Sequence, residues 1–539
     1  MIRMRNRLAV AAAVLLIASL LIPAGVWGAP KSELVVVSGM WSPPNNFSPI
    51  FTDSSYGYYC VRFMFQGMVE ARLENNQMKF FPALAQKWEI GADNQTFTFT
   101  IHPKAAWHDG KPVTAEDVLF TLMTISDPRT QTNRGAEIAT IAGLDERGKR
   151  PAGGQLGVRV IGPKQIEIKT RVPVDPTMFL ERVGNNVYIL PKHVLGDVPP
   201  DQLARHPFML NPTVGSGPYK FVQYKTDQFI ELVQNENYHN GVPNVRRVFV
   251  RIIPPTTMVA QLERQDMDLS AGFGIGEIPI EDWDRVKGMP HIRAVTFAGP
   301  GYQYMLVNFQ KAYLQDKRVR RAMAHAINRQ LIVNQLIKGE ATLAEGPIPP
   351  RNPYYNKNVK PWPFDTARAR QLLVEAGWDF NRTLLLRVPV GNTIRERSAD
   401  IIRENLLAAG VKVDIQKSDF PTHIAALQQG NFDMALLGWA GPTDPDVSSQ
   451  YRTGGQYNYS YHSVAQMDQL LDEGVKISDP AKRRAVYDKF QELFADELPI
   501  IVLYYQNARN AIAKRMTNVF DDAAGLYDFR TYTWVAGTQ

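Results

Sequence analysis

Three side chains around residue 440 have the chemistry to hold a small molecule. Trp439 offers a flat aromatic face, and Asp444 and Asp446 place two carboxylates in a proline-rich loop. A strand predicted over 433–438 ends directly before them. Because ligands of α/β proteins collect at the carboxyl ends of strands, this pattern favours a stacking wall at Trp439 and a polar anchor at Asp444. The alternative interpretation, equally open from spacing alone, is a core tryptophan followed by an ordinary turn.

The usual signatures of catalysis are missing. The sequence holds no HExxH motif, no GxSxG motif and no phosphate loop ending in GK[ST]. Its histidines are scattered without the spacing of metal ligands, so we expect no metal and no cofactor. Carboxylate pairs, Asp444 with Asp446 and Asp521 with Asp522, leave one alternative open. This is a secreted hydrolase that uses paired carboxylates on a glycan or an ester.

Residues 1–28 have the order of parts of a secretory signal peptide. Three arginines lie within the first seven residues, an apolar run of about 15 residues follows from Leu8 to Ile22, and Val26 and Gly28 are small enough for the cleavage site. The apolar run is shorter than the roughly 20 residues that span a bilayer. We therefore expect an exported chain that begins at Ala29.

Size and charge narrow the class further. The exported chain has about 510 residues, which predicts two or three domains. Without the signal arginines the formal net charge falls from +7 to +4, and the basic residues are scattered, so we expect no nucleic-acid partner. Cys60 is the only cysteine. We expect it to be buried and inert, with no intramolecular disulfide and no lipid anchor, in a protein that diffuses freely in a periplasm.

The pattern along the chain changes midway. The first half is mainly strands, such as 96–101, with a capping box at Thr114–Asp117 that opens a helix. A long helix is predicted to begin after Asp316 and to stop at Gly339. Strands and helices then alternate with short connections, which predicts parallel strands covered by helices in a lobe over about 300–505. The alternating elements are strands 384–388, 411–415 and 433–438 and helices 393–409 and 421–429.

A series of ordered segments resembles one known family. The segments are Pro82–Trp88, Thr96–Gly110, Thr114–Val118, Gly215–Phe221, Asn235–Tyr238, Asp316–Ala322, Ala326–Arg329, Ala369–Trp378 and Glu497–Ile500. Together they resemble the bacterial extracellular solute-binding proteins of family 5, the peptide- and nickel-type binding components of ABC importers.

This resemblance implies an α/β protein with two lobes and a central ligand cleft. It implies a first lobe at 29–297, enlarged by an extra subdomain near 71–214 and completed by 506–539, and a second lobe at 298–505. Such a protein is no enzyme. As a periplasmic monomer, it would carry an oligopeptide or similar solute to permease subunits in the membrane. An oligosaccharide binder, a chaperone and a sensory receptor of the same fold remain alternatives.

The resemblance also bears on the site. In peptide binders of this family, an aspartate three residues after the loop tryptophan holds the peptide ammonium, but that position is Pro442 here. Either Asp444 substitutes, or the solute has no free amine there. The arginine that dipeptide binders use has no counterpart before Arg395. Abundant aromatic residues suit stacking on sugar rings. The candidate ligand-binding residues are Trp439, Asp444, Asp446, Trp41, Tyr56, Tyr58, Gly272, Phe273, Tyr302, Tyr304 and Asn308.

Overall fold

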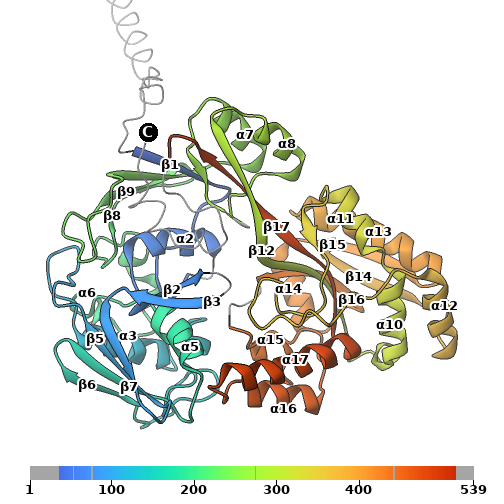
Figure 1. Ribbon diagram of the computed structural model, residues 1–539, viewed down its shortest axis with the longest axis horizontal. Helices are drawn as coiled ribbons and strands as arrows, with labels where there is room; N and C mark the ends of the chain where they lie inside the picture. The colour runs from blue at the N-terminus through green and yellow to red at the C-terminus, as the bar shows by residue number, and fades with distance from the viewer. Residues whose placement is uncertain (1–34, 53, 75–76, 273–274, 441–443, 517–539) are drawn as a thin grey trace, which may run out of the picture.

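One long sheet runs through both halves of the molecule. The computed structural model describes residues 35–52, 54–74, 77–272, 275–440 and 444–516. The main sheet has eleven strands in these ranges (Figure 1). In spatial order they are β15 (Lys412–Ser418), β14 (Thr383–Pro389), β16 (Met434–Ala440), β12 (Ile292–Val307), β17 (Ile500–Ala513), β11 (Leu269–Ser270), β1 (Val35–Met40), β10 (Arg247–Ile252), β9 (Phe229–Gln234) and β8 (Tyr219–Lys225), with β13 (Ala341–Thr342) beside β17.

Two adjacent long strands, β12 and β17, connect the halves (Figure 1). We call the part from β11 to β8, with the elements from α2 to α8, the first lobe. The second lobe is the part from β15 to β16, with α9 to α17. The register of β12 against β17 shifts between Ala298 and Tyr302, at the crossing between lobes. On the first-lobe side, residues 507–513 of β17 pair with 292–298 of β12.

The first lobe carries two smaller sheets and short helices. Its hairpin is β2 (Val69–Glu74) with β3 (Gln77–Pro82), and its four-stranded sheet is β4 (Ala85–Ile90), β5 (Thr96–Ile101), β7 (Gln165–Lys169) and β6 (Val158–Gly162). Its helices are α2 (Ser55–Met64), α3 (Ala115–Ser126), α4 (Gly135–Ile138), α5 (Pro176–Phe179), a π-helical turn (Leu180–Asn185), α6 (Lys192–Leu195), α7 (Pro255–Glu263) and α8 (Trp283–Lys287), with 3-10 turns at Leu203–Arg205, Pro207–Met209 and Ile280–Asp282.

Local signals in the first lobe act as predicted. Strand β5 alternates buried and half-buried residues, and the capping box of Thr114 and Asp117 begins α3. Cys60 is buried in the first-lobe core, and burial raises the pKa of its thiol, which confirms the prediction of a buried cysteine.

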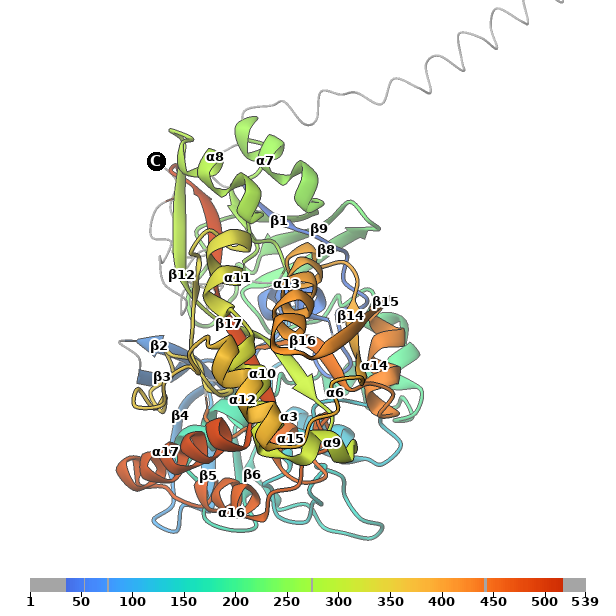
Figure 2. The same ribbon diagram turned by 90° about the vertical axis from the view of Figure 1, so that its right-hand side faces the viewer.

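The second lobe is the predicted alternation of strands and helices. Strand β14 lies parallel to both β15 and β16, and helices α10 to α13 cover one face of the sheet (Figure 2). Its helices are α9 (Ala312–Gln315), α10 (Lys317–Ala326), α11 (Arg329–Leu336), α12 (Thr366–Glu375), α13 (Thr393–Ala409), α14 (Phe420–Gln428), α15 (Ser448–Tyr451), α16 (Ala465–Gly474) and α17 (Pro480–Glu497).

The prediction of one long helix after Asp316 is wrong in its middle part. Helix α10 ends at Ala326, the backbone turns extended at Ile327, and a separate α11 begins after Asn328. The side chain of Asn328 accepts a hydrogen bond from the Leu331 N–H at 2.9 Å, which caps the new helix.

The buried apolar residues form separate clusters in the two lobes. One buried cluster fills the first lobe, and two clusters lie on the two faces of the second-lobe sheet. Ile394, in the first turn of α13, packs against both the first-lobe cluster and one second-lobe cluster. The start of α13 therefore lies at the boundary between the lobes. In the described part of the chain, no helix combines the length and apolarity needed to cross a membrane.

Candidate ligand-binding site

Trp439 lies near the end of β16, opposite Tyr302 of the antiparallel β12. Its ring is half-buried, and its centroid is 5.0 Å from that of Tyr457. Tyr302 and Tyr304 are buried in the cluster on the same face of the sheet. The hydroxyls of Tyr302 and Tyr451 are 2.9 Å apart and hydrogen bonded. Of these aromatic residues, Trp439 and Tyr457 keep exposed surface, and the two tyrosines of β12 belong to the core.

The carboxylate of Asp444 is held by a buried arginine. The Nη1 and Nη2 atoms of Arg483, in α17, donate to its two oxygens at 2.7 and 3.0 Å. Asp175 of the first lobe lies 3.6 Å from the same guanidinium, which is fully buried. A buried ion pair of this geometry satisfies both charges internally. Asp444 therefore already has a cationic partner within the chain.

Asp446 is engaged in the same way, but across the lobes. Nη2 of Arg182, in the π-helical turn of the first lobe, donates to its Oδ2 at 2.7 Å. The backbone N–H of Ser448 donates to its Oδ1 at 2.9 Å. Burial alone would raise the pKa of Asp446, but Arg182 and Ser448 outweigh it and lower the pKa. The carboxylate thus stays ionised and fixed.

Unlike Asp444 and Asp446, Arg395 has no ion-pair partner among the described residues. It lies in the first turn of α13, where Asn392 caps the helix by accepting from the Arg395 N–H at 2.9 Å. Its Nε donates to Oε1 of Gln303, on β12, at 2.9 Å. It forms no ion pair with any residue in the described ranges. Arg395 is half-buried, and this partial burial lowers the pKa of its guanidinium.

The predicted first-lobe residues lie on several segments. Trp41 and Tyr56 are half-buried and pack against the first-lobe core. The hydroxyl of Tyr58 donates to the Asn186 carbonyl at 3.3 Å, and the Arg134 guanidinium lies 4.1 Å from the centre of its ring.

Of the three remaining predicted residues, one is a backbone feature, one lies outside the described residues and one is a core group. Gly272 is buried with φ at +106°, a conformation that favours glycine, and Phe273 lies outside the described residues. Asn308 is fully buried, and its amide donates to the carbonyls of Gly430 and Phe432 at 3.1 and 2.8 Å. Asn308 therefore stabilises a turn next to β16.

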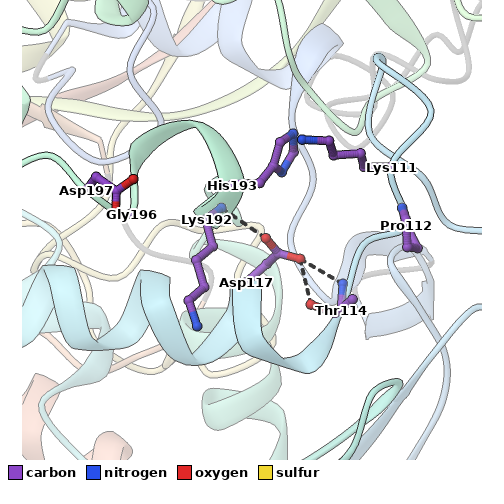
Figure 3. Close-up of a pocket in the computed structure, with 8 residues that line it drawn as sticks. All are labelled: Lys111, Pro112, Thr114, Asp117, Lys192, His193, Gly196 and Asp197. Atoms are coloured by element: carbon purple, nitrogen blue, oxygen red, sulfur yellow. Dashed lines mark hydrogen bonds between the residues drawn. The ribbon is translucent and has the colours of Figure 1, made fainter.

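A surface pocket of about 500 Å³ lies between α3 and α6 of the first lobe (Figure 3). It contains none of the predicted site residues. The Oδ2 atom of Asp117 accepts from Thr114, and its Oδ1 accepts from the Lys192 N–H at 2.9 Å. This carboxylate joins the start of α3 to α6, so its role in the pocket is structural. Among the described residues, no group of His, Cys, Asp and Glu could hold a metal ion.

The fold defines a class: α/β proteins of two lobes joined by two long adjacent strands. The chain belongs to the bacterial extracellular solute-binding proteins, family 5, whose model of the middle region matches residues 79–461. The prediction of the family is thereby confirmed, as is that of a two-lobed α/β fold.

Known relatives agree with this membership. The oligopeptide-binding protein AppA of Bacillus subtilis is 27% identical over 80% of this chain and 79% of its own. The heme-binding protein A of Haemophilus influenzae is 26% identical over 85% of this chain and 84% of its own. The solved structure of Bacillus subtilis AppA with a nonapeptide matches with a TM-score of 0.79 at 24% identity, covering 94% of this chain and 99% of AppA. This structural likeness confirms the fold.

Proposed function

We propose that this protein captures an oligopeptide or a similar solute between its lobes and delivers it to the permease subunits of an ABC importer. The family match carries this proposal. The matched residues 79–461 include α13, which holds Arg395, and β16, which holds Trp439, together with the neighbouring strands β12 and β14. The similarity to an oligopeptide-binding protein over 80% of this chain supports the peptide class. Export through the segment 1–28, which lies outside the described residues, would bring the protein to the periplasm as a monomer.

We propose the lobe boundaries expected from the sequence: a first lobe at 29–297 with an extra subdomain near 71–214, completed by 506–539, and a second lobe at 298–505. Residues 29–34 and 517–539 of this division lie outside the described residues. The pairing of residues 507–513 with 292–298 supports this division. A solute that contacts both lobes binds the closed arrangement more strongly than the open one, so it shifts the population toward closure.

Binding leaves the solute chemically unchanged in this proposal. Acid–base hydrolysis would need a carboxylate free to exchange a proton with the substrate. Asp444 and Asp446 are instead held by Arg483 and Arg182, and Asp521 and Asp522 lie outside the described residues. These ion pairs support a binding protein over the alternative of a secreted hydrolase.

Titration calorimetry on protein that has been unfolded, dialysed and refolded tests the function. We expect heat of binding with short oligopeptides, accompanied by a decrease in the radius of gyration measured by X-ray scattering. Cello-oligosaccharides and Ni²⁺ serve as comparison solutes. Binding of the oligosaccharides alone would favour stacking against Trp439 and Tyr457 and the oligosaccharide alternative. Turnover of any bound solute, or a rigid particle that binds none of the three classes, would contradict the proposal.

A further inference from the structure

A side chain of the second lobe is hydrogen bonded to the indole of Trp439. The amide oxygen of Gln450, in α15, accepts from Nε1 of Trp439 at 3.0 Å, and its amide nitrogen donates to the Val447 carbonyl at 3.1 Å. In this arrangement both ends of the amide have a partner. Because an indole has a single N–H donor and no acceptor, this bond engages all of the hydrogen-bonding capacity of the ring.

Helix α15 gives Gln450 a fixed base, although the helix has only four residues. At its start, the Ser448 N–H donates to Oδ1 of Asp446 at 2.9 Å. At its end, the hydroxyls of Tyr451 and Tyr302, on β12, are 2.9 Å apart and hydrogen bonded. Asp446, Tyr451 and Tyr302 are all buried. Since so short a helix is not stable by itself, these contacts set the position of Gln450.

Tyr457 is a second support of the same ring, and it is tied to the same helix. Its ring centroid lies 5.0 Å from that of Trp439, with an angle of 53° between the ring planes. Its backbone N–H donates to the Ser449 carbonyl at 2.8 Å. Burial raises the pKa of the Tyr457 hydroxyl, and the charge of Arg134, in the first lobe, opposes this shift. The supported ring therefore lies close to the first lobe, where a solute held between the lobes would meet it.

The indole is asymmetric, so its orientation decides which of its atoms a solute meets. Rotation about the last side-chain bond of a tryptophan has two broad minima roughly half a turn apart, which exchange the two edges of the ring. The bond to Gln450 forms in only one of them, because it needs Nε1 on the side of α15. In that orientation the N–H points toward the helix, and the exposed surface of Trp439 is ring carbon.

We infer that Gln450 is a positioning residue, which selects the orientation of Trp439 that presents ring carbons, and not the N–H, to the solute. This inference rests on the proposed function, because it needs Trp439 to line the solute site. A ring that is already fixed loses little further freedom when a solute arrives. The affinity is therefore higher than with a ring that exchanges between two orientations.

A double-mutant cycle tests this role. The probe is the oligopeptide that the refolded protein captures from a tryptic digest of casein, identified by native mass spectrometry. In calorimetry, Gln450→Leu should weaken its binding about fivefold, and Gln450→Glu, which keeps an acceptor oxygen, should weaken it less. In the Trp439→Phe background, Gln450→Leu should have no further effect, because a phenyl ring is unchanged by half a turn and has no N–H. Gln330→Leu is the matched control, since Gln330 is exposed and its amide donates to Asn334 within α11.

The orientation itself is observable by fluorine NMR of ligand-free protein labelled with 5-fluorotryptophan. The signal of residue 439 is the one missing from the spectrum of Trp439→Phe. It should be single and sharp in the wild type and in Gln330→Leu, and broadened or split in Gln450→Leu. A purely structural contribution of Gln450 would instead lower the unfolding midpoint and leave this signal single.

Equal losses of affinity from Gln450→Leu in the wild-type and Trp439→Phe backgrounds would overturn the inference, since Gln450 would then act without the indole. Wild-type affinity of Gln450→Leu, or an unchanged fluorine signal, would overturn it as well. Each of these results leaves the proposed function intact. A wild-type protein that captures no peptide would contradict the proposed function, and the fluorine spectra would still decide whether Gln450 fixes the ring.

Discussion

Arg182 of the first lobe and Asp446 of the second lobe form an ion pair across the lobe boundary, with 2.7 Å between Nη2 and Oδ2. A second contact of the same kind lies beside it, where Arg483 of the second lobe approaches Asp175 of the first lobe to 3.6 Å while binding Asp444. Charges from both lobes therefore meet in one buried network. Such a network is complete only when the lobes are in contact, so it stabilises the closed arrangement.

Arg182→Gln should shift the ligand-free protein toward an open arrangement. The substitution leaves Asp446 buried without its cation in the closed state, a loss of about 3–5 kcal/mol when one member of a buried pair is removed. X-ray scattering should give a larger radius of gyration, and calorimetry should give an affinity at least about tenfold weaker. Arg129→Gln is the matched control, because Arg129 is 61% exposed and pairs with Asp127 inside the first lobe. Identical scattering from both variants would exclude this role for the pair.

Asp444→Asn should destabilise the fold instead of removing a solute anchor. It leaves the fully buried Arg483 without its bidentate partner, so the free energy of unfolding in urea should fall by about 3–5 kcal/mol. The triple variant Asp444→Leu/Arg483→Met/Asp175→Asn removes all three charges of the network and should cost less. If Asp444→Asn keeps wild-type stability and loses solute binding, the carboxylate is the polar anchor expected from the sequence.

Element boundaries in the second lobe were predictable because their signals are local. Helix α13 runs from Thr393 to Ala409 as predicted, since Asn392 caps its start and Gly410, with φ at +100°, ends it. The break at Ile327 was missed because apolar residues continue through it with helical spacing. The capping side chain of Asn328 outweighs that pattern.

The partners of the site residues could not be read from the sequence in the same way. Asp446 and Arg182 are 264 positions apart, and no periodicity connects them. Tyr302 and Tyr304 lie on a strand buried on both faces, where alternation does not separate core from site. The sequence did hold a signal for Arg395 as a candidate site residue, because this cation lies in the first helical turn after a predicted strand.

Gly438→Ala should weaken binding with little effect on stability. The added methyl group would meet the flexible ends of Gln303 and Arg395, which can move aside, so the expected loss of folding free energy is below about 1 kcal/mol. Moving Gln303 and Arg395 away from their places beside Gly438, next to Trp439, should lower the affinity for a bound solute about tenfold in calorimetry. Gly162→Ala in β6, where a Cβ meets nothing within 4 Å, is the control. Equal affinities of the two variants would show that this contact is irrelevant to binding.

Trp439→Ala should reduce affinity by about tenfold, because it removes a half-buried ring that pairs with Tyr457 at 5.0 Å. Trp439→Phe keeps an aromatic face and should retain most of the affinity. Calorimetry with one captured solute compares the three proteins. Unchanged affinity of Trp439→Ala would remove this residue from the site and favour its interpretation as a core tryptophan.

Glu277 should make stability depend on pH near neutrality. It is buried beside β17, where Gln506 Nε2 donates to it at 2.9 Å and Arg509 Nη2 lies 3.4 Å away. Burial raises its pKa from 4.5 to about 7, although Arg509 opposes this shift. The folded state then retains a proton that the unfolded state releases, so the contribution of Glu277 to stability is greatest below pH 4.5 and falls as pH rises to 7.

The loss over this interval should be at most about 3 kcal/mol. Glu277→Gln cannot ionise and should flatten the decline in the free energy of unfolding measured in urea. Glu263→Gln is the control, since Glu263 is an exposed partner of Arg285 in the same lobe, and it should follow the wild-type curve. Because Gln506 and Arg509 belong to one of the two strands that connect the lobes, ionisation of Glu277 acts at the crossing itself. Parallel curves for wild type and Glu277→Gln would show that this carboxyl group is already ionised in the folded protein.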